Sequence, residues 1–149
     1  MSYTHGTKDT LEWMKRAKPE PSPKDLSTQI GVHFEEVAEM LDQLDHKERE
    51  ISYQIGSLTA RLSHLATMLK QNQGIVIKDR VEFLDSLADQ IVTAVGVAHC
   101  AGMDPVGALN EVNRSNFSKF DDNGNPLLDI NRKIIKGPNY SKPDLKPFV

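Results

Sequence analysis

Three carboxylates fall within five residues of the sequence, at Glu35, Glu36 and Glu39. Glu36 and Glu39 are three residues apart, so a helix places both on one side, and Glu35 lies four residues before Glu39. These acids stand next to the apolar residues Phe34 and Val37. We therefore expect them to border a buried face, whereas acids that are only solvated usually lie opposite one.

A second acidic set repeats this arrangement at Glu82, Asp85 and Asp89, which step by three and four residues. Each directly follows an apolar residue of one stripe, so this set also borders a predicted buried face. Like charges repel strongly when they gather away from water, and a hard divalent cation relieves that repulsion. Because Mg²⁺ prefers oxygen ligands, the two sets together predict a magnesium site, with Mn²⁺ as a substitute.

Acidic residues in a helical protein have interpretations other than a magnesium site. Ordinary solvated helix faces account for most acid pairs at this spacing, and this interpretation stays open. Di-iron sites in helical bundles use Glu-x-x-His pairs, and the sequence contains none. The acidic run at residues 121–124 is not an EF-hand loop, because its glycine is misplaced and a closing Glu is absent.

Helices must position these acids, and apolar residues recur at helical spacing through most of the chain. Ser22 and Pro23 form a helix-start signal, and Asp25 is placed as the acid of a capping box. Helices are expected over residues 8–17, 23–44, 51–69, 79–101 and 105–118. The second begins at Pro23 and has its apolar stripe over residues 26–44, and the third is given by the stripe over residues 51–69. The prediction is an all-α fold, a bundle of four to five helices joined by short loops.

One domain is expected over residues 1–149. It begins with the N-terminal helix and a proline-rich break, residues 1–22, and ends in a tail over residues 121–149. Apolar runs within residues 127–135 predict a small hairpin in that tail, and the rest is expected to be extended.

Composition limits the classes of function. The apolar content of 38% gives a modest core, so we expect self-association as a dimer or tetramer. The net charge of −3 is not that of a nucleic-acid binder. Neither a signal-peptide pattern nor an apolar run of about 20 residues occurs, so we expect a cytoplasmic protein that binds no membrane. Cys100 is the single cysteine, and we expect it to lie in the core.

Three elements in a fixed order resemble a known superfamily. They are Glu35-Glu36-Val37-Ala38-Glu39, the acidic segment 82–89, and Asn116-Phe117-Ser118-Lys119-Phe120. This set resembles the all-α nucleoside triphosphate pyrophosphohydrolases, which include MazG proteins, dimeric dUTPases and phosphoribosyl-ATP pyrophosphohydrolases. Residues 111–119 and 136–140 look especially like the MazG-like branch of phages and bacteria, which is related to phosphoribosyl-ATP pyrophosphohydrolase. The resemblance covers roughly residues 25–145.

The resemblance implies roles for the first acidic set. Glu36 and Glu39 match the metal ligands of the family's first motif, and Glu35 matches its leading Glu. Bound Mg²⁺ lowers the pKa of a coordinated water, and Glu35 or Glu39 then accepts the water's proton or orients the water.

The second set departs from the family pattern at one position. Asp89 matches the closing acid of a Glu-x-x-Asp motif, but Ser86 stands where that motif has its Glu. The same spacing does occur one turn earlier, at Glu82 and Asp85. We assign Asp85 with Asp89 as ligands and keep Glu82 as a further candidate, which leaves the number of metal ions open.

The remaining site residues are expected to bind substrate. Asn116 and Lys119 match the family's Asn-x-x-Lys pair, Arg114 and Lys136 add cations, and His33 borders the nucleoside. The implied activity is hydrolysis of a nucleoside triphosphate between its α and β phosphates, giving a monophosphate and pyrophosphate, for control of nucleotide pools. Two alternatives stay open: phosphoribosyl-ATP hydrolysis in histidine biosynthesis, and a helical oligomer that binds a partner without catalysis.

Overall fold

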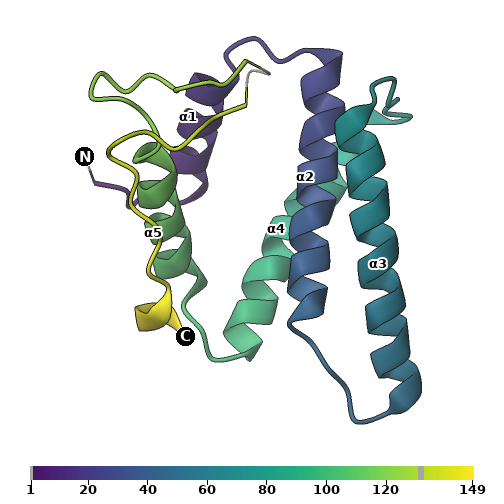
Figure 1. The fold of residues 1–149 in the computed structure, drawn as a ribbon. Coiled ribbons are helices and arrows are strands. Elements are labelled where there is room, and N and C mark those ends of the chain that lie inside the picture. Colours follow the sequence, from purple (N-terminus) through teal and green to yellow (C-terminus); the bar gives the residue numbers. More distant parts are fainter. Residues whose placement is uncertain (1, 131–132) are drawn as a thin grey trace. The chain divides into compact units, whose positions relative to one another are not determined.

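The computed structural model describes residues 2–130 and 133–149 (Figure 1). In this part of the chain the elements are α1 (Thr7–Ala17), α2 (Pro23–Asp42), α3 (Arg49–Gln71), α4 (Arg80–Cys100), α5 (Pro105–Phe117) and the 3₁₀ helix η1 (Lys146–Phe148). The prediction of an all-α fold with four to five helices is confirmed, and the described residues form five α-helices. The predicted helix ends lie within two residues of the observed ones, and they depend on capping signals that are local in sequence.

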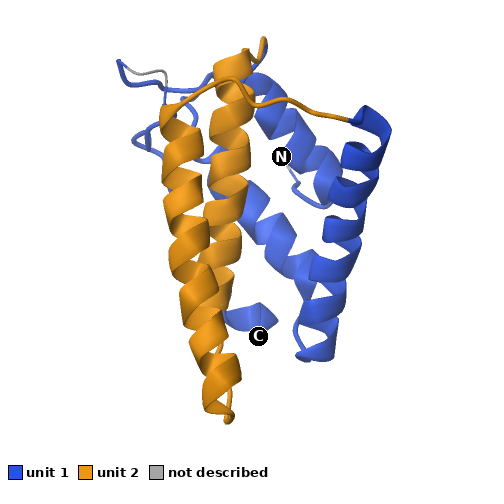
Figure 2. Ribbon diagram, turned by 90° about the vertical axis from the view of Figure 1, so that its right-hand side faces the viewer, with its two compact units in different colours: residues 1–19, 79–149 blue, residues 20–78 orange. Residues whose placement is uncertain are grey.

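The chain forms two compact units (Figure 2). One unit comprises residues 20–78 and contains α2 and α3. The other comprises residues 1–19 and 79–149 and contains α1, α4, α5 and the tail. The first acidic set belongs to the α2 and α3 unit, and the second belongs to the other unit.

The start of α2 has the predicted capping box. The Ser22 hydroxyl accepts a hydrogen bond from the backbone N–H of Asp25 at 3.1 Å, and the Asp25 carboxylate accepts one from the backbone N–H of Ser22 at 2.9 Å. Pro23 occupies the first turn, where its missing N–H costs nothing. These bonds satisfy donors that a helix start leaves free, so they fix where α2 begins.

Helices α2 and α3 run antiparallel and pack closely, because small residues lie where their backbones approach (Figure 1). Ser27, Gly31 and Ala38 of α2 and Ala66 of α3 are buried. A Cβ atom added to Gly31 would lie 2.7 Å from the carbonyl oxygen of Ala66, which is closer than real Cβ contacts. The Ser27 hydroxyl donates to the carbonyl oxygen of Leu69 at 2.8 Å and thereby satisfies its own buried polar atom.

The C-terminal end of α3 is capped from α2. The Lys24 ammonium donates to the carbonyl oxygens of Lys70 and Asn72, the latter at 3.0 Å. A cation here satisfies free carbonyl groups and interacts favourably with the negative end of the helix dipole. Together with Ser27, this contact fixes the register of α2 against α3.

An aromatic core joins α1 to α5 in the other unit. The Trp13 ring is parallel to that of Phe120, with centroids 5.9 Å apart, and Tyr3 stacks on Phe117 at 5.0 Å. Phe117 and Phe120 meet edge to face at 5.8 Å. These offset and edge-on arrangements are those that aromatic quadrupoles favour.

Asn113 has the largest fully buried polar side chain among the residues that the structure describes, and it connects the start of α1 to α5. Its amide nitrogen donates to the carbonyl oxygen of Gly6 at 2.8 Å, and its amide oxygen accepts from the Thr10 hydroxyl at 2.9 Å. Removing this amide would leave buried partners unsatisfied, so Asn113 has a structural role.

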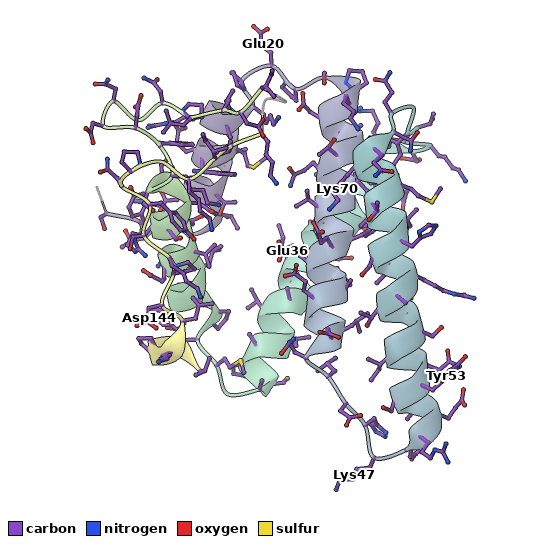
Figure 3. All side chains as sticks on the ribbon, viewed as in Figure 1. Glu20, Glu36, Lys47, Tyr53, Lys70 and Asp144 are labelled. Atoms are coloured by element: carbon purple, nitrogen blue, oxygen red, sulfur yellow. The ribbon has the colours of Figure 1, made fainter. Side chains whose placement is uncertain are left out.

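The C-terminal segment is held on α5 by a charged clamp. The Arg114 guanidinium makes two hydrogen bonds to the Glu111 carboxylate, at 2.7 and 2.8 Å, and donates to the carbonyl oxygen of Lys142 at 3.1 Å. Glu111 also accepts from the backbone N–H of Asp144 at 2.9 Å. Its pKa is lowered to about 2, first by the Arg114 hydrogen bond and then by the Asp144 amide. Asp144 lies just before η1 (Figure 3).

We expect Glu111→Gln to loosen the C-terminal segment. The folded pKa of Glu111 is depressed. The stability that this carboxylate contributes is therefore fully present above its ordinary pKa of 4.5 and is lost as pH falls through about 2. At neutral pH the variant should exchange the Asp144 amide hydrogen about tenfold faster, which mass-detected hydrogen exchange measures. Glu12→Gln, at an exposed α1 pair with Arg16, is the control and should leave that exchange rate unchanged; equal rates in all three proteins would contradict the clamp.

Helix α4 carries no buried residue. Val81 is 75% exposed, Leu84 68% and Ile91 54%, although all three belong to the apolar stripe that predicted a buried face. The expectation of a buried stripe is therefore wrong for this helix as the structure describes it. Periodicity identifies an apolar face but not the surface that covers it.

Two smaller findings concern other segments. The predicted hairpin is reduced to one antiparallel bridge between Leu128 and Ile134, and its residues 131 and 132 lie outside the described residues. Cys100, expected in the core, is exposed.

Among the described helices none is by itself long and apolar enough to cross a membrane. Helices α4 and α5 pass that test only as a pair, and this pair is bent by 116°.

Candidate functional site

The first acidic set divides into one paired carboxylate and two others. Glu35 forms an ion pair with Lys70 of α3, with 2.7 Å between the ammonium nitrogen and a carboxylate oxygen. Glu36 and Glu39, one turn apart on α2, make no hydrogen bond or ion pair with their side chains in the described part of the chain. Figure 3 labels Glu36 and Lys70 on their two helices. The two unpaired acids are the ones assigned as metal ligands.

The electrostatics of Glu36 match this assignment. Its pKa is raised above the ordinary value, first because neighbouring atoms desolvate the carboxylate and then because Glu39 and Glu35 repel its charge. His33 acts in the opposite direction. A bound divalent cation would relieve this repulsion, and carboxylate oxygen atoms are ligands that Mg²⁺ prefers.

We expect Glu36→Gln to stabilise the metal-free protein at pH 7. Because the folded pKa of Glu36 is raised, the folded state binds more protons than the unfolded state, so stability falls as pH rises from 4.5 through the raised pKa. Removing the charge removes this loss. The urea midpoint of the variant should exceed that of the wild type at pH 7 and approach it at pH 4; a lower midpoint at pH 7 would contradict the repulsion.

The second acidic set lies on the exposed helix α4. Glu82, Asp85 and Asp89 are exposed, and within the described residues their side chains make no hydrogen bond or ion pair. Each carboxylate is free to accept ligands or solvent. The position expected to carry the family's Glu is Ser86, and it too lies on this exposed surface.

Neither set alone forms a metal cage. Among the residues that the structure describes, no group of three or more His, Cys, Asp or Glu side chains is close enough to hold a metal ion. Glu36 and Glu39 belong to one compact unit, and Asp85 and Asp89 belong to the other. Assigning both sets to one cation therefore stays a prediction from the sequence.

The Asn-x-x-Lys pair is assembled at the end of α5. The Lys119 ammonium donates to the side-chain oxygen of Asn116 at 2.9 Å and lies 5.6 Å from the centre of the Trp13 ring. The Trp13 indole N–H donates to the backbone carbonyl oxygen of Asn116 at 2.9 Å. The side-chain oxygen of Asn116 is thus occupied, so the pair presents an amide NH₂ group and an ammonium group, both hydrogen-bond donors suited to an anion.

The other predicted substrate-binding residues have different surroundings. Arg114 donates its hydrogen bonds to Glu111 and to the tail, so in this structure it holds the C-terminal segment. Lys136 lies 4.7 Å from the centre of the Tyr140 ring. His33 lies on α2, with its ring centre 6.2 Å from that of Phe34. Their roles in substrate binding stay predictions.

Two contacts at these sites were not found from the sequence. Lys70 pairs with Glu35 from another helix, and Trp13 contacts Asn116 across 103 positions of the chain. The Glu111–Arg114 pair had a local signal, since opposite charges three residues apart on a helix attract. Searches against family models, curated proteins and solved structures find no match for this chain.

Proposed function

We propose that this protein is a Mg²⁺-dependent nucleoside triphosphate pyrophosphohydrolase. The observation that carries the proposal is the unpaired, mutually repelling pair Glu36 and Glu39, beside a third acid that is neutralised by Lys70. Their hard oxygen atoms fit Mg²⁺ or Mn²⁺. The resemblance of the ordered motifs to those of the superfamily adds Asp85 and Asp89 as ligands and Glu82 as a further candidate.

In this mechanism the chain's own residues bind, orient and transfer a proton. When bound, Mg²⁺ would neutralise charge on the polyphosphate and acidify a water. Glu36 and Glu39 would hold the cation, and Glu35 or Glu39 accepts the proton of the water that attacks the α phosphorus. The bond from that phosphorus to the bridging oxygen breaks, and pyrophosphate leaves with that oxygen. Asn116 and Lys119 stabilise the negative charge that develops on the leaving group.

A substrate panel tests the proposal directly. The protein is incubated with Mg²⁺ and each of the eight common ribo- and deoxynucleoside triphosphates, modified nucleotides and phosphoribosyl-ATP, and pyrophosphate is assayed. We expect release of pyrophosphate and a monophosphate from at least one triphosphate. Turnover of phosphoribosyl-ATP alone would favour the histidine-pathway alternative. No turnover, together with a melting temperature that neither Mg²⁺ nor Mn²⁺ changes, would overturn the enzyme proposal.

Self-association is the second part of the proposal, and a specific observation favours it. The large apolar residues of α4 are exposed along its stripe, including Val81, Leu84, Ile91 and Val95. Exposed apolar patches of this kind usually mark an interaction surface. A second copy of the chain is the simplest partner, because one face then covers itself around a two-fold axis. A non-catalytic oligomer would use the same face, and the substrate panel separates the two.

We expect Ile91→Asp to weaken self-association at least about tenfold, because it places a charge in the centre of the apolar α4 face. Sedimentation velocity over a range of protein concentrations measures the change. Val76→Asp is the control, since Val76 is also β-branched and apolar and is 79% exposed but lies outside the helices. A wild-type protein that stays monomeric at all concentrations, or an unaffected Ile91→Asp oligomer, would contradict this role of α4.

A further inference from the structure

Lys119 is a cation with unusual neighbours. Within the described residues it makes no ion pair, and its ammonium contacts the side-chain oxygen of Asn116 and the face of the Trp13 ring. A lysine on a solvated surface has many rotamers available and loses them when it binds an anion. Here two contacts from different elements restrict the ammonium before any ligand arrives.

Trp13 contacts both members of the pair at once. Its ring lies under the Lys119 ammonium, an arrangement in which the negative face of the indole attracts the cation. Its N–H donates to the Asn116 backbone carbonyl, which belongs to the last turn of α5. The ring is itself fixed, because it stacks in parallel on Phe120, a buried core residue. A rigid platform thus connects the aromatic core to the two donors.

We propose that Trp13 is the positioning residue for the phosphate-binding pair, an inference that rests on the proposed function. Trp13 makes no contact with substrate in this account. It holds the Lys119 ammonium and the Asn116 backbone so that the ammonium and the Asn116 NH₂ group face the same phosphate chain. Preorganised donors bind more tightly because less freedom is lost on binding. The proposed function makes the ligand of these two donors an oxyanion of the pyrophosphate class.

The test measures binding of inorganic pyrophosphate with Mg²⁺ by calorimetry. Lys119→Met, which keeps the apolar stem, should raise Kd at least tenfold, and Trp13→Leu should raise it about fivefold to tenfold. Trp13→Phe keeps an aromatic face and should recover most of the loss. In the Lys119→Met background Trp13→Leu should have less than about a twofold further effect, because the ring contact with the Lys119 ammonium accounts for most of the Trp13 effect, and the bond to the Asn116 backbone for the remainder. The inference would be overturned if the effects of Lys119→Met and Trp13→Leu on Kd simply added, or if Trp13→Phe bound pyrophosphate as weakly as Trp13→Leu.

A second measurement needs no ligand and keeps the core intact. Trp13 is the only tryptophan, so its fluorescence reports this site alone. Lys119→Met should shift the emission maximum, while Lys15→Met, at an exposed α1 position two residues from Trp13, should leave it unchanged. An unshifted emission in Lys119→Met would overturn the contact even if Trp13→Leu fails to fold.

The two proposals fail in different ways. If the wild type binds pyrophosphate with the expected coupling but hydrolyses no nucleotide, the proposed activity fails while the anion-binding role of the pair remains. If nucleotides are hydrolysed but the effects of Trp13→Leu and Lys119→Met simply add, the positioning role fails alone. A wild type that does not bind pyrophosphate overturns the inference.

Discussion

Replacing Glu39 by Gln should lower the rate of pyrophosphate release at least about a hundredfold, with little change in helical content. The amide keeps the size of the carboxylate but loses the charge that holds a hard cation. Asp89→Asn is expected to have an effect of similar size, since the resemblance assigns it to the same metal. Steady-state kinetics at saturating Mg²⁺ and far-UV circular dichroism measure the two quantities.

The control for these variants lies on the same helix. Asp42→Asn removes an exposed carboxylate at the last residue of α2 and should retain full activity. Activity that persists in Glu39→Gln would refute Glu39 as a ligand, and activity that persists in Asp89→Asn would refute the contribution of α4. A loss shared by all three variants would indicate a general effect of negative charge rather than a metal site.

Gly31→Ala should destabilise the α2 and α3 unit by about 1–3 kcal/mol, although alanine is the better helix former. The added Cβ atom would meet the Ala66 carbonyl oxygen at 2.7 Å and the Lys70 side chain at 2.9 Å, so the helices must separate. Lys70 is also the partner of Glu35, so the same change should disturb the acidic set. Urea unfolding followed by circular dichroism measures the loss.

Gly56→Ala is the matched substitution on α3. A Cβ atom there meets nothing within 4 Å, so the variant should gain about 0.5–1 kcal/mol from reduced backbone freedom in the unfolded chain. The same Gly→Ala change should thus lower the free energy of unfolding at Gly31 and raise it at Gly56. These opposite signs distinguish the effect of close helix packing from that of helix propensity. Equal effects at Gly31 and Gly56 would contradict the observed α2–α3 contact.

Local features of the fold were predictable because their causes are local. The Ser22–Asp25 capping box and the Asp104 cap before Pro105 depend on residues within one turn, and both are present. Whether an apolar stripe is covered depends on other segments or other chains. The α4 stripe around Leu84 therefore led to a wrong expectation of burial.

The candidate site was predictable only in part, for the same reason. Spacing alone identified Glu36 and Glu39 as neighbours on one face of α2. It did not reveal that Lys70 neutralises Glu35, because that pairing requires the register of α3 against α2. Nor did it reveal Trp13 at Asn116, which depends on how α1 packs against α5.

Binding of Mn²⁺ tests the central claim, that the α2 carboxylates hold a divalent cation. Electron paramagnetic resonance of free Mn²⁺ is recorded during titration of the wild type, Glu39→Gln and Asp42→Asn, with and without pyrophosphate. We expect the wild type and Asp42→Asn to bind Mn²⁺ alike, and Glu39→Gln to bind at least about tenfold more weakly. A wild type that binds no Mn²⁺ under either condition, or a Glu39→Gln protein that binds it as tightly as the wild type, would contradict the account.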